Sequence, residues 1–507
     1  MKQTQHVFFY LILLFLNGLI WTSCSKTGPS GLLKPNKFPD TYTVVDTIIR
    51  SGENRLISRV KLSWWGKDED GFIIAYEISF DNTQWKRVFK QDSTFTLAPQ
   101  TSDTADFIFY VRAVDNLNQV DPTPARLRIP VKNSPPTVSY VSTGVNTPIS
   151  AYPVYRYAWE GEDIDGASNI NYYELVWNDT TNTNNYYRVP STVNSIVIEA
   201  ENPTDVNTLL KVYYNNNTLP AAERMKGIKL NQKDSLYIRA VDVAGAKSKF
   251  KCSHQVYFKA ISASNSNKIL LVDGYYALIA NYPGNVTTRT FYETELNNIG
   301  VGYDTLVLYR RSSSKFLNLP SDDFVASKTL QMFNIVLWYS GKTPEQSLGY
   351  IQRISNEFFN KGGRLFLSTP QNNTFDPLAP YYTFTPMDTL FGPNTSIGAG
   401  LYLQPSENDS LVATPNAVGY PNLKVSGFIN SAIPFTVRPT DEPVYAAYTI
   451  NYNTGPAWTK SNIVMARRRQ AGKTTFVVTT LELEKLNGKS NVTQFFQHLV
   501  KNEFGAM

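Results

Sequence analysis

Apolar and polar residues alternate in short segments over the first half of the chain. In residues 72–80, Ile74, Tyr76 and Ile78 fall on one face, while small and charged side chains occupy the other. Because successive side chains of a β-strand point to opposite faces, this period of two predicts half-buried strands. Turn residues such as Asp81-Asn82 separate the segments. Roughly seven such strands in about 95 residues predict a β-sandwich.

One sequence motif occurs twice in this half of the chain. Residues 64–71 and 159–166 both read W-x-G-x-D-x-D-G. A Tyr-Glu pair follows each copy, and each copy ends in a strand-like Tyr-x-Arg-Ala-Val-Asp segment, at residues 110–115 and 237–242. Three matches in the same order predict two homologous domains.

The order of these motifs resembles the fibronectin type III family, in which the Trp packs in the core and the late Tyr begins the F strand. The resemblance covers residues 42–132 and 136–260 and implies an all-β, immunoglobulin-like sandwich for each. The second copy is longer by about 30 residues, and we place this insertion within 199–230. The paired prolines at 135–136 predict a stiff, extended joint between the copies.

The aspartates of the repeated turn suggest a calcium hypothesis, because hard cations prefer clustered oxygen ligands. They are Asp68, Asp70, Asp163 and Asp165. Each turn has few carboxylates and lacks the downstream Glu of an EF-hand loop. We favour a turn in which the Asp side chains bond backbone amides and the glycine supplies a positive φ. We therefore predict no metal and no other cofactor, with calcium as the alternative.

The pattern changes near residue 262. Continuous apolar runs replace the alternation, and between them apolar residues lie three or four positions apart. Such runs are typical of strands buried on both faces, and the spacing is typical of amphipathic helices. The predicted strands lie at 268–273, 305–309, 334–339, 364–368 and 472–480; two predicted helices end at Gly300 and at Gly362-Gly363, and a third spans 492–504. This order predicts a parallel sheet with helices on both faces.

Residues 267–507, apart from a segment at 372–445 that fits poorly and is expected to be an insertion, resemble the class I glutamine amidotransferase-like fold. That fold is a flavodoxin-like α/β domain. The strand followed by Gly274, the Lys361-Gly-Gly-Arg364 segment before a core strand and the late strand with Gly472 carry the resemblance. In the enzymes of that family a Cys nucleophile follows a central strand, with His and Glu further along the chain.

This chain departs from the family at the nucleophile. The strand at 364–368 leads through Thr369 into Pro370-Gln371, without a Cys, and His498 is the one histidine downstream. We place His498 on the polar face of the last helix. We therefore predict a degenerate domain that is not an enzyme. A glycosidase or peptidase that uses carboxylates or hydroxyls at the strand ends is the alternative.

Polar and aromatic residues follow the predicted parallel strands. Ligands of open α/β sheets bind at the carboxyl ends of the strands, and this mixture of side chains suits a sugar or a peptide. Ordinary loop and helix-cap chemistry is the other interpretation. The candidate ligand-binding residues are Asp273, Tyr275, Ser340, Lys342, Ser368, Thr369 and Gln371.

The chain begins with a signal-like segment. Lys2 precedes an apolar run at 7–21, which is shorter than the roughly 20 residues that span a bilayer, and the run ends at Thr22-Ser23-Cys24. Small residues before a Cys, after a short apolar stretch, fit a signal peptide. The chain here resembles bacterial lipoproteins, whose Cys becomes the lipidated, palmitate-bearing first residue. An uncleaved anchor, or a cleaved signal with an incidental Cys, is the alternative.

The lipoprotein resemblance implies a place in the cell. Residues 1–23 would be the signal peptide, and residues 24–41, rich in Gly, Pro, Ser and Lys, a tether to the first domain. Ser25 and Lys26 follow Cys24 without an acidic run. By resemblance to other lipoproteins, this disfavours retention in the inner membrane. We expect a lipid anchor in the outer membrane and leave its side open.

Composition narrows the function classes. The net charge of +6, from 48 basic and 42 acidic residues spread along the chain, predicts no nucleic-acid partner. Two Cys and three His exclude a multi-disulfide scaffold and a Cys/His-rich metal site. Cys252 alternates with His254 and Val256, so we predict a small core residue. We predict that residues 467–469, all Arg, alternate along a strand with a solvated face, and contact with a partner or an anionic lipid is the alternative.

Three function classes remain. We favour a non-catalytic, lipid-anchored envelope protein whose sandwiches present the degenerate α/β domain to a glycan, a peptide or a protein partner. A hydrolase acting on glycan or peptide and a purely structural spacer are the alternatives. The geometry of the strand ends distinguishes them, because a glycosidase needs two facing carboxylates in a cleft.

Overall fold

The computed structural model of the chain describes residues 34–507 apart from short gaps. The gaps are 49–58, 98–103, 133, 142–147, 165–166, 244, 275–283, 309, 312–314, 317–321, 341–345, 371–382, 392–400, 406–407, 409, 431 and 453–457. Cys24, the predicted signal peptide and most of the predicted tether lie outside the described residues. Among the described helices, none combines the length and apolar character needed to cross a membrane.

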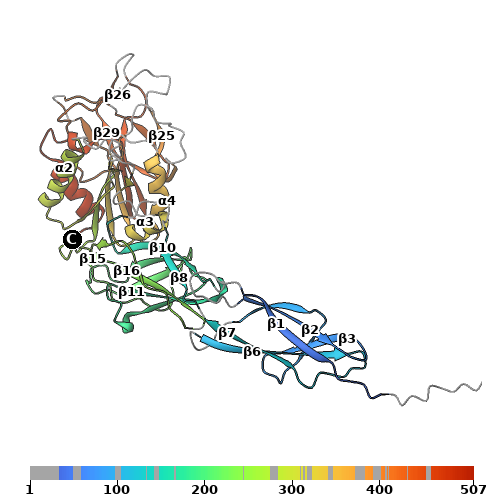
Figure 1. The fold of residues 1–507 in the computed structure, drawn as a ribbon. Helices are drawn as coiled ribbons and strands as arrows, with labels where there is room; N and C mark the ends of the chain where they lie inside the picture. Colours follow the sequence, from blue (N-terminus) through green and yellow to red (C-terminus); the bar gives the residue numbers. More distant parts are fainter. Residues whose placement is uncertain are drawn as a thin grey trace, which may run out of the picture. The chain divides into compact units, whose positions relative to one another are not determined.

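The chain divides into two compact units, with the boundary after Asn133. The first unit contains a β-sandwich of two antiparallel sheets (Figure 1, blue). One sheet has the order β1 (Asp40–Ile48), β2 (Arg59–Lys67) and β5 (Asp92–Thr96); the other has the order β4 (Lys86–Val88), β3 (Ile73–Ser79), β6 (Thr104–Asp115) and β7 (Ala125–Lys132). Between them lie Trp64, Leu62, Phe109 and Val111, all buried.

The second unit begins with another sandwich (Figure 1, green). One main sheet has the order β14 (Leu210–Tyr214), β13 (Ser195–Ala200), β10 (Val154–Glu162) and β8 (Thr137–Tyr140). The other has the order β12 (Tyr187–Pro190), β11 (Ile170–Trp177), β16 (Leu236–Asp242) and β17 (Lys251–Cys252). A small third sheet contains β15 (Gln232–Asp234), β18 (Val256–Phe258) and β9 (Ser150–Ala151). The additional strand β14 lies within the segment where the sequence comparison places the insertion.

The two sandwiches are built alike, which confirms the β-sandwich prediction for both copies of the repeat. In the first, β2 pairs with β1 and β5, and β3 pairs with β4 and β6. In the second, β10 pairs with β8 and β13, and β11 pairs with β12 and β16. The motif tryptophans Trp64 and Trp159 are both buried, 2% and 1% exposed.

The rest of the second unit is a large mixed sheet with helices. Five neighbouring strands run parallel, in the order β20 (Asp304–Val307), β19 (Ile269–Asp273), β23 (Ile335–Tyr339), β24 (Arg364–Ser368) and β32 (Lys473–Thr479). The sheet continues through antiparallel strands β31 (Ile463–Gln470), β28 (Phe435–Val437), β25 (Met387–Leu390), β29 (Glu442–Ala447) and β27 (Leu411–Ala413). The segment predicted as an insertion, 372–445, thus supplies antiparallel strands to this edge. Two short pairs lie apart from it: β21 (Arg310–Arg311) with β22 (Lys315–Phe316), and β26 (Leu401–Tyr402) with β30 (Asn451–Tyr452).

Helices cover both faces of the parallel strands (Figure 1). Along β19, Ile269 and Leu271 share a core with α2 (Gly284–Asn298) and α5 (Val492–Gln497). Leu270 and Val272 point the other way and share a core with α3 (Asp323–Leu330) and α4 (Gln346–Asn360). The strand is apolar throughout because each face meets a helix layer. The predicted stripe of α4 is buried as expected: Leu348, Ile351, Ile354 and Phe358.

The closing helix differs from the prediction of one amphipathic helix over 492–504. The α-helical part ends at Gln497, and His498–Glu503 continues as a wider π-helical turn. The apolar stripe is nevertheless buried, since Val492, Phe495, Phe496 and Leu499 are all inaccessible. His498 is partly covered, with its ring 4.3 Å from that of Tyr420.

Two predictions about side-chain environment are wrong. Cys252 is exposed, because it lies on β17, a short strand at the edge of its sheet. The Cys252 thiol donates a hydrogen bond to the Ser253 carbonyl at 3.1 Å. Arg467 is 2% exposed rather than solvated. Its guanidinium binds Glu442 at 2.8 Å and also Glu503, and Arg468 binds Asp441 at 2.8 Å. Carboxylates from distant parts of the sequence therefore neutralise this basic cluster.

Candidate ligand-binding sites

The carboxyl ends of three parallel strands bring several predicted site residues together. Asp273 ends β19 and lies opposite Tyr339 at the end of β23, which lies opposite Ser368 at the end of β24. Ser340 and Thr369 come directly after these strands. Of the other predicted residues, Tyr275, Lys342 and Gln371 lie outside the described residues.

Asp273 is held inside the protein. Its carboxylate is 2% exposed and accepts a hydrogen bond from the Arg289 Nε atom on α2 at 3.2 Å. The neighbouring Tyr339 ring stacks on Tyr292, with centroids 4.3 Å apart. Burial, reinforced by the negative charge of Asp273, raises the pKa of Tyr339 well above its ordinary value, so its hydroxyl stays protonated. This arrangement anchors α2 to the end of β19.

The hydroxyl residues at the strand ends are engaged with backbone groups or enclosed. The Ser368 Oγ atom donates to the Leu481 carbonyl at 2.9 Å, and the Ser340 amide donates to the Ser368 carbonyl at 2.9 Å. The Thr369 amide donates to the Thr479 carbonyl at 2.9 Å. All three side chains are at most 5% exposed. A serine or threonine needs an adjacent base to act as a nucleophile.

The two described histidines have other partners. His254 lies in the second sandwich, where its Nε2 atom is 2.9 Å from the Tyr155 hydroxyl. His498 packs on Tyr420, and its Nε2 atom is 3.7 Å from Glu503. Burial lowers the pKa of both imidazoles, and Glu503 opposes this in part for His498. These contacts of the two histidines therefore involve residues other than the serine and threonine at the strand ends.

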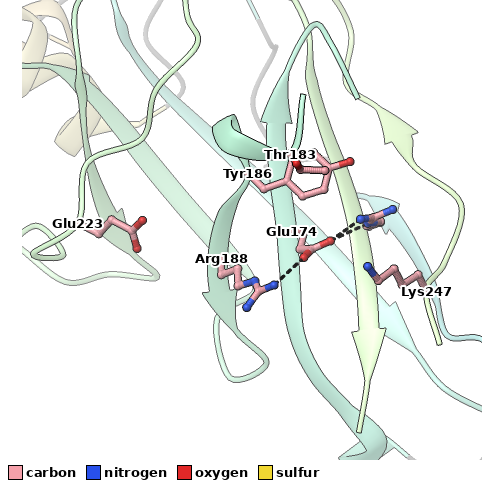
Figure 2. A pocket seen from close by; sticks show the side chains of 7 residues that line it. Glu174, Thr183, Tyr186, Arg188, Glu223 and Lys247 are labelled. Atoms are coloured by element: carbon pink, nitrogen blue, oxygen red, sulfur yellow. Dashed lines mark hydrogen bonds and ion pairs between the residues drawn. The ribbon is translucent and has the colours of Figure 1, made fainter. Parts of the chain in front are cut away.

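A concave site lies on the second sandwich, and the sequence did not predict it (Figure 2). It has a volume of about 340 Å³. The Arg239 Nε atom donates to Glu174 Oε2 at 2.7 Å, and the Arg188 guanidinium lies 3.4 Å from Glu174 Oε1. The lining is polar and charged: Glu174, Thr183, Tyr186, Arg188, Glu223, Arg239 and Lys247.

The charged centre of this pocket recurs in the first sandwich. There Glu77 accepts hydrogen bonds from Arg112 at 2.7 and 2.9 Å and lies 3.1 Å from Arg87. Arg112 stacks over the Trp85 ring at 4.0 Å, much as Arg239 lies 4.5 Å from the Phe250 ring in the second copy. An arrangement that both copies share is explained by the fold itself. The Tyr-Glu and Tyr-x-Arg motifs were its signal in the sequence.

The repeated Asp turn is described in the first copy, where it is closed by backbone amides. Asp68 Oδ1 accepts the Asp70 amide at 3.3 Å, and Asp70 accepts the Lys37 amide at 3.1 Å. In the second copy Asp163 is nearly buried, and Asp165 lies outside the described residues. Within the described part of the chain, no three His, Cys, Asp or Glu side chains are placed to hold a metal ion.

The glycine of the first turn has a different role from the predicted one. Gly71 does not adopt a positive φ. A Cβ atom there would lie 2.2 Å from the Asn116 side chain and 2.5 Å from the Asp68 carboxylate. The position therefore needs glycine because two side chains approach the backbone closely.

Comparisons with known proteins give fold likenesses and no family. No protein-family model matches the chain, and no curated protein matches it. Similar solved structures include a two-domain fibronectin type III segment from chicken tenascin, at 8% identity over 44% of this chain and 99% of that chain, with a TM-score of 0.21. Fibronectin(III)-like modules of Clostridium thermocellum CbhA match at 10% identity over 43% and 94%, with a TM-score of 0.16.

A shorter likeness is to the PKD1 domain from Vibrio cholerae metalloprotease PrtV. It has 17% identity, covers 19% of this chain and 99% of that chain, and has a TM-score of 0.14. TM-scores this low add nothing to the description of the sandwiches. That description follows from the strand pairings of this chain.

Proposed function

We propose that the protein is a non-catalytic, lipid-anchored envelope protein whose sandwiches present a flavodoxin-like, amidotransferase-like domain for contact with a glycan, a peptide or a protein partner. The observation that carries the proposal is the junction between the second sandwich and the α/β region. A domain that presents another needs a fixed connection to it. The contacts at this junction supply one.

The junction combines apolar packing with ion pairs. The Tyr152 ring of the sandwich packs edge-on against Phe333, with centroids 5.1 Å apart, and its hydroxyl donates to the Thr305 carbonyl at 3.0 Å. Arg156 binds Asp322, the N-cap of α3. One continuous buried core includes sandwich residues and the α3/α4 face of the sheet. A shared apolar core opposes relative domain motion, unlike a small polar contact.

Two features support the degenerate α/β assignment. The parallel strands, numbered in chain order, are arranged 2-1-3-4-5, which is the order of flavodoxin-like folds. At the end of β24, where the enzymes that this region resembles have their Cys, the chain reads Ser368-Thr369-Pro370. Contact rather than covalent chemistry is the function that fits enclosed hydroxyls and histidines that contact Tyr155, Tyr420 and Glu503.

The lipid anchor is tested by changing each cysteine in turn. Cys24→Ala should move the protein from the membrane fraction to the soluble fraction and abolish labelling by radioactive palmitate. Cys252→Ala removes the other thiol and serves as the matched control, so its fractionation and labelling should match those of the unmodified protein. Membrane retention of the Cys24→Ala protein with residues 1–23 still attached would refute the anchor.

A further inference from the structure

Two aromatic side chains form a flat, exposed step on the first sandwich. Tyr42 on β1 and Trp65 on β2 are direct cross-strand neighbours, on the outer face of the sheet. Their ring centroids are 5.7 Å apart and their planes differ by only 17°. Tyr42 is 44% exposed and Trp65 47% exposed, and Val44 beside them is 45% exposed. Exposed apolar side chains that gather in one place mark an interaction site more often than scattered ones do.

The fold does not require this aromatic pair. The motif aligns Trp65 with Glu160 in the second sandwich, and there the cross-strand partner of Glu160 is Ser139. Both polar residues are exposed. The preceding position is Trp in both copies and is buried in both, as Trp64 and Trp159. The sandwich thus fixes the inner residue, whereas the outer position is free to vary.

Hydrogen-bonding groups lie beside the aromatic step on the same face. The Lys61 Nζ atom is 3.0 Å from Asp46 and 3.2 Å from Asp92, and these side chains are 41 to 51% exposed. The Ser63 hydroxyl donates to Asp46 at 3.4 Å. Asp40 and Lys67 pair in register on the other side of the rings. Partly exposed carboxylates, ammonium groups and a hydroxyl therefore border the rings.

We propose that the face containing Tyr42, Val44, Trp65, Asp46, Lys61 and Asp92 binds a neutral glycan. A pyranose ring has an apolar C–H face that lies flat on an aromatic plane, and hydroxyls at its edge that bond carboxylates and ammonium groups. With Asp40 and Lys67 at its edge, the face has three aspartates and two lysines. Their charges nearly cancel, so the face offers no field for a strongly charged polymer. The proposal assigns a binding face to the first sandwich itself, so it goes beyond the contact role proposed for the α/β domain and is independent of the lipid anchor.

A protein partner fits this face less well. Stable protein interfaces bury about 800 Å² on each side around an apolar centre. Here three apolar side chains stand between charged pairs on both sides. A single extended sugar chain fits such a narrow strip, because each of its consecutive sugar rings needs only one aromatic side chain to stack on.

The test is isothermal titration calorimetry of the full chain with cellohexaose, chitohexaose and maltohexaose. We expect at least one hexasaccharide to bind with a Kd of about 1 mM or tighter. Trp65→Ala should weaken that binding at least about tenfold, and Trp65→Tyr should retain most of it, because the flat ring remains. Glu160→Ala changes the same register position of the second sandwich and should leave the affinity unchanged.

The same titrations can overturn the proposal. It fails if none of the three hexasaccharides binds at about 5 mM, or if Trp65→Ala and Tyr42→Ala both bind as the unmodified protein does. Circular dichroism and the unfolding temperature verify that the variants are folded. Failure here leaves the Cys24 fractionation result untouched, so the two proposals are judged separately.

Discussion

The two sandwiches have the same interior and different exteriors. Each buries the motif tryptophan, and each holds a glutamate between two arginines on neighbouring strands. The first sandwich exposes the Tyr42–Trp65 step on its outer sheet, while the second has Ser139 and Glu160 at these positions. The second instead adds β14 and shares its core with the α/β region. The repeated residues thus explain the fold, and the unshared ones point to the separate role of each copy.

The largest expected effect comes from truncating the shared tryptophans. Trp64→Ala and Trp159→Ala should each cost about 3–5 kcal/mol, because each leaves a cavity in a packed core. Trp159 belongs to a core that extends into the α/β region, whereas Trp64 belongs to a separate core in the first unit. Hydrogen exchange should therefore show lost protection of β19 in Trp159→Ala and unchanged protection of β19 in Trp64→Ala. Equal loss in both variants would contradict the separation of the cores.

A smaller effect should distinguish the two glutamates. The Glu174 side chain is 2% exposed and that of Glu77 is 15% exposed. Glu174→Gln removes the partner of the enclosed Arg239 and should cost about 3 kcal/mol. Glu77→Gln should cost about 1 kcal/mol, because water reaches Arg112 and Arg87 more readily. Urea unfolding, followed by hydrogen exchange in each unit, measures the loss of unfolding free energy in the two variants. A larger loss of stability for Glu77→Gln than for Glu174→Gln would refute this ranking.

The junction in the second unit can be probed with adjacent aspartates. Asp322 binds Arg156 across the junction and caps α3 by accepting the Val325 amide at 2.8 Å. Asp322→Ala should lower the stability of this unit by about 1–2 kcal/mol. Asp323→Ala is the matched control, since its ion pair with Arg353 is about half exposed, and it should cost less than about 0.5 kcal/mol. Similar thermal unfolding of both variants would mean that the junction contact contributes little.

The smallest expected effect is a difference in acid response. His254 is exposed on one side and contacts Tyr155 on the other, and this partial desolvation lowers its pKa from 6.5, so protonation favours the unfolded state. The contribution of this neutral imidazole to the stability of the second unit should be complete above about pH 6.5 and should decline as the pH falls below that value toward its lowered pKa. In the first unit, the amides of Gln84 and Thr83 hold the pKa of Asp81 below 3.8. Stability from this carboxylate is present above about pH 4 and is lost only below it.

Thermal unfolding monitored by hydrogen exchange between pH 7 and pH 3 tests this order of events. The second unit should weaken first, and His254→Phe should reduce the response that begins below about pH 6.5. Loss of the first unit before the second would contradict the assignment of these groups.

The sequence predicted elements with a regular pattern and failed where distant segments meet. The period of two and the motif tryptophans predicted both sandwiches, and the apolar runs predicted the five parallel strands of the mixed sheet but not the antiparallel strands that the segment 372–445 adds to it. Arg467 was predicted to be solvated because the alternation of a strand indicates which residues share a face. It does not indicate which other segments cover that face. Its partners Glu442 and Glu503 are 25 and 36 residues away. Cys252 was assigned to the core because its alternation with Val256 continues across the end of β17.

The candidate sites show the same limit. The carboxyl ends of the parallel strands were predictable, because every βα unit places them at one edge. The burial of Ser368 and Thr369 there depends on packing by Leu481 and β32, far along the chain. The Tyr42–Trp65 step was missed because 23 residues separate two side chains that only the strand register brings together. The difference between the two motif copies, Trp65 against Glu160, was the signal that could have revealed it.

The most direct test of the account gives the first sandwich the outer residues of the second. The double variant Tyr42→Ser with Trp65→Glu should keep the first unit folded, with a stability loss of about 1 kcal/mol or less, since the pair is exposed and cross-strand pairs contribute that much at most. Hexasaccharide binding by the same protein should be lost in calorimetry. Binding that persists in the double variant, or a first unit that unfolds, would contradict the claim that the two sandwiches share an interior and differ in a binding face.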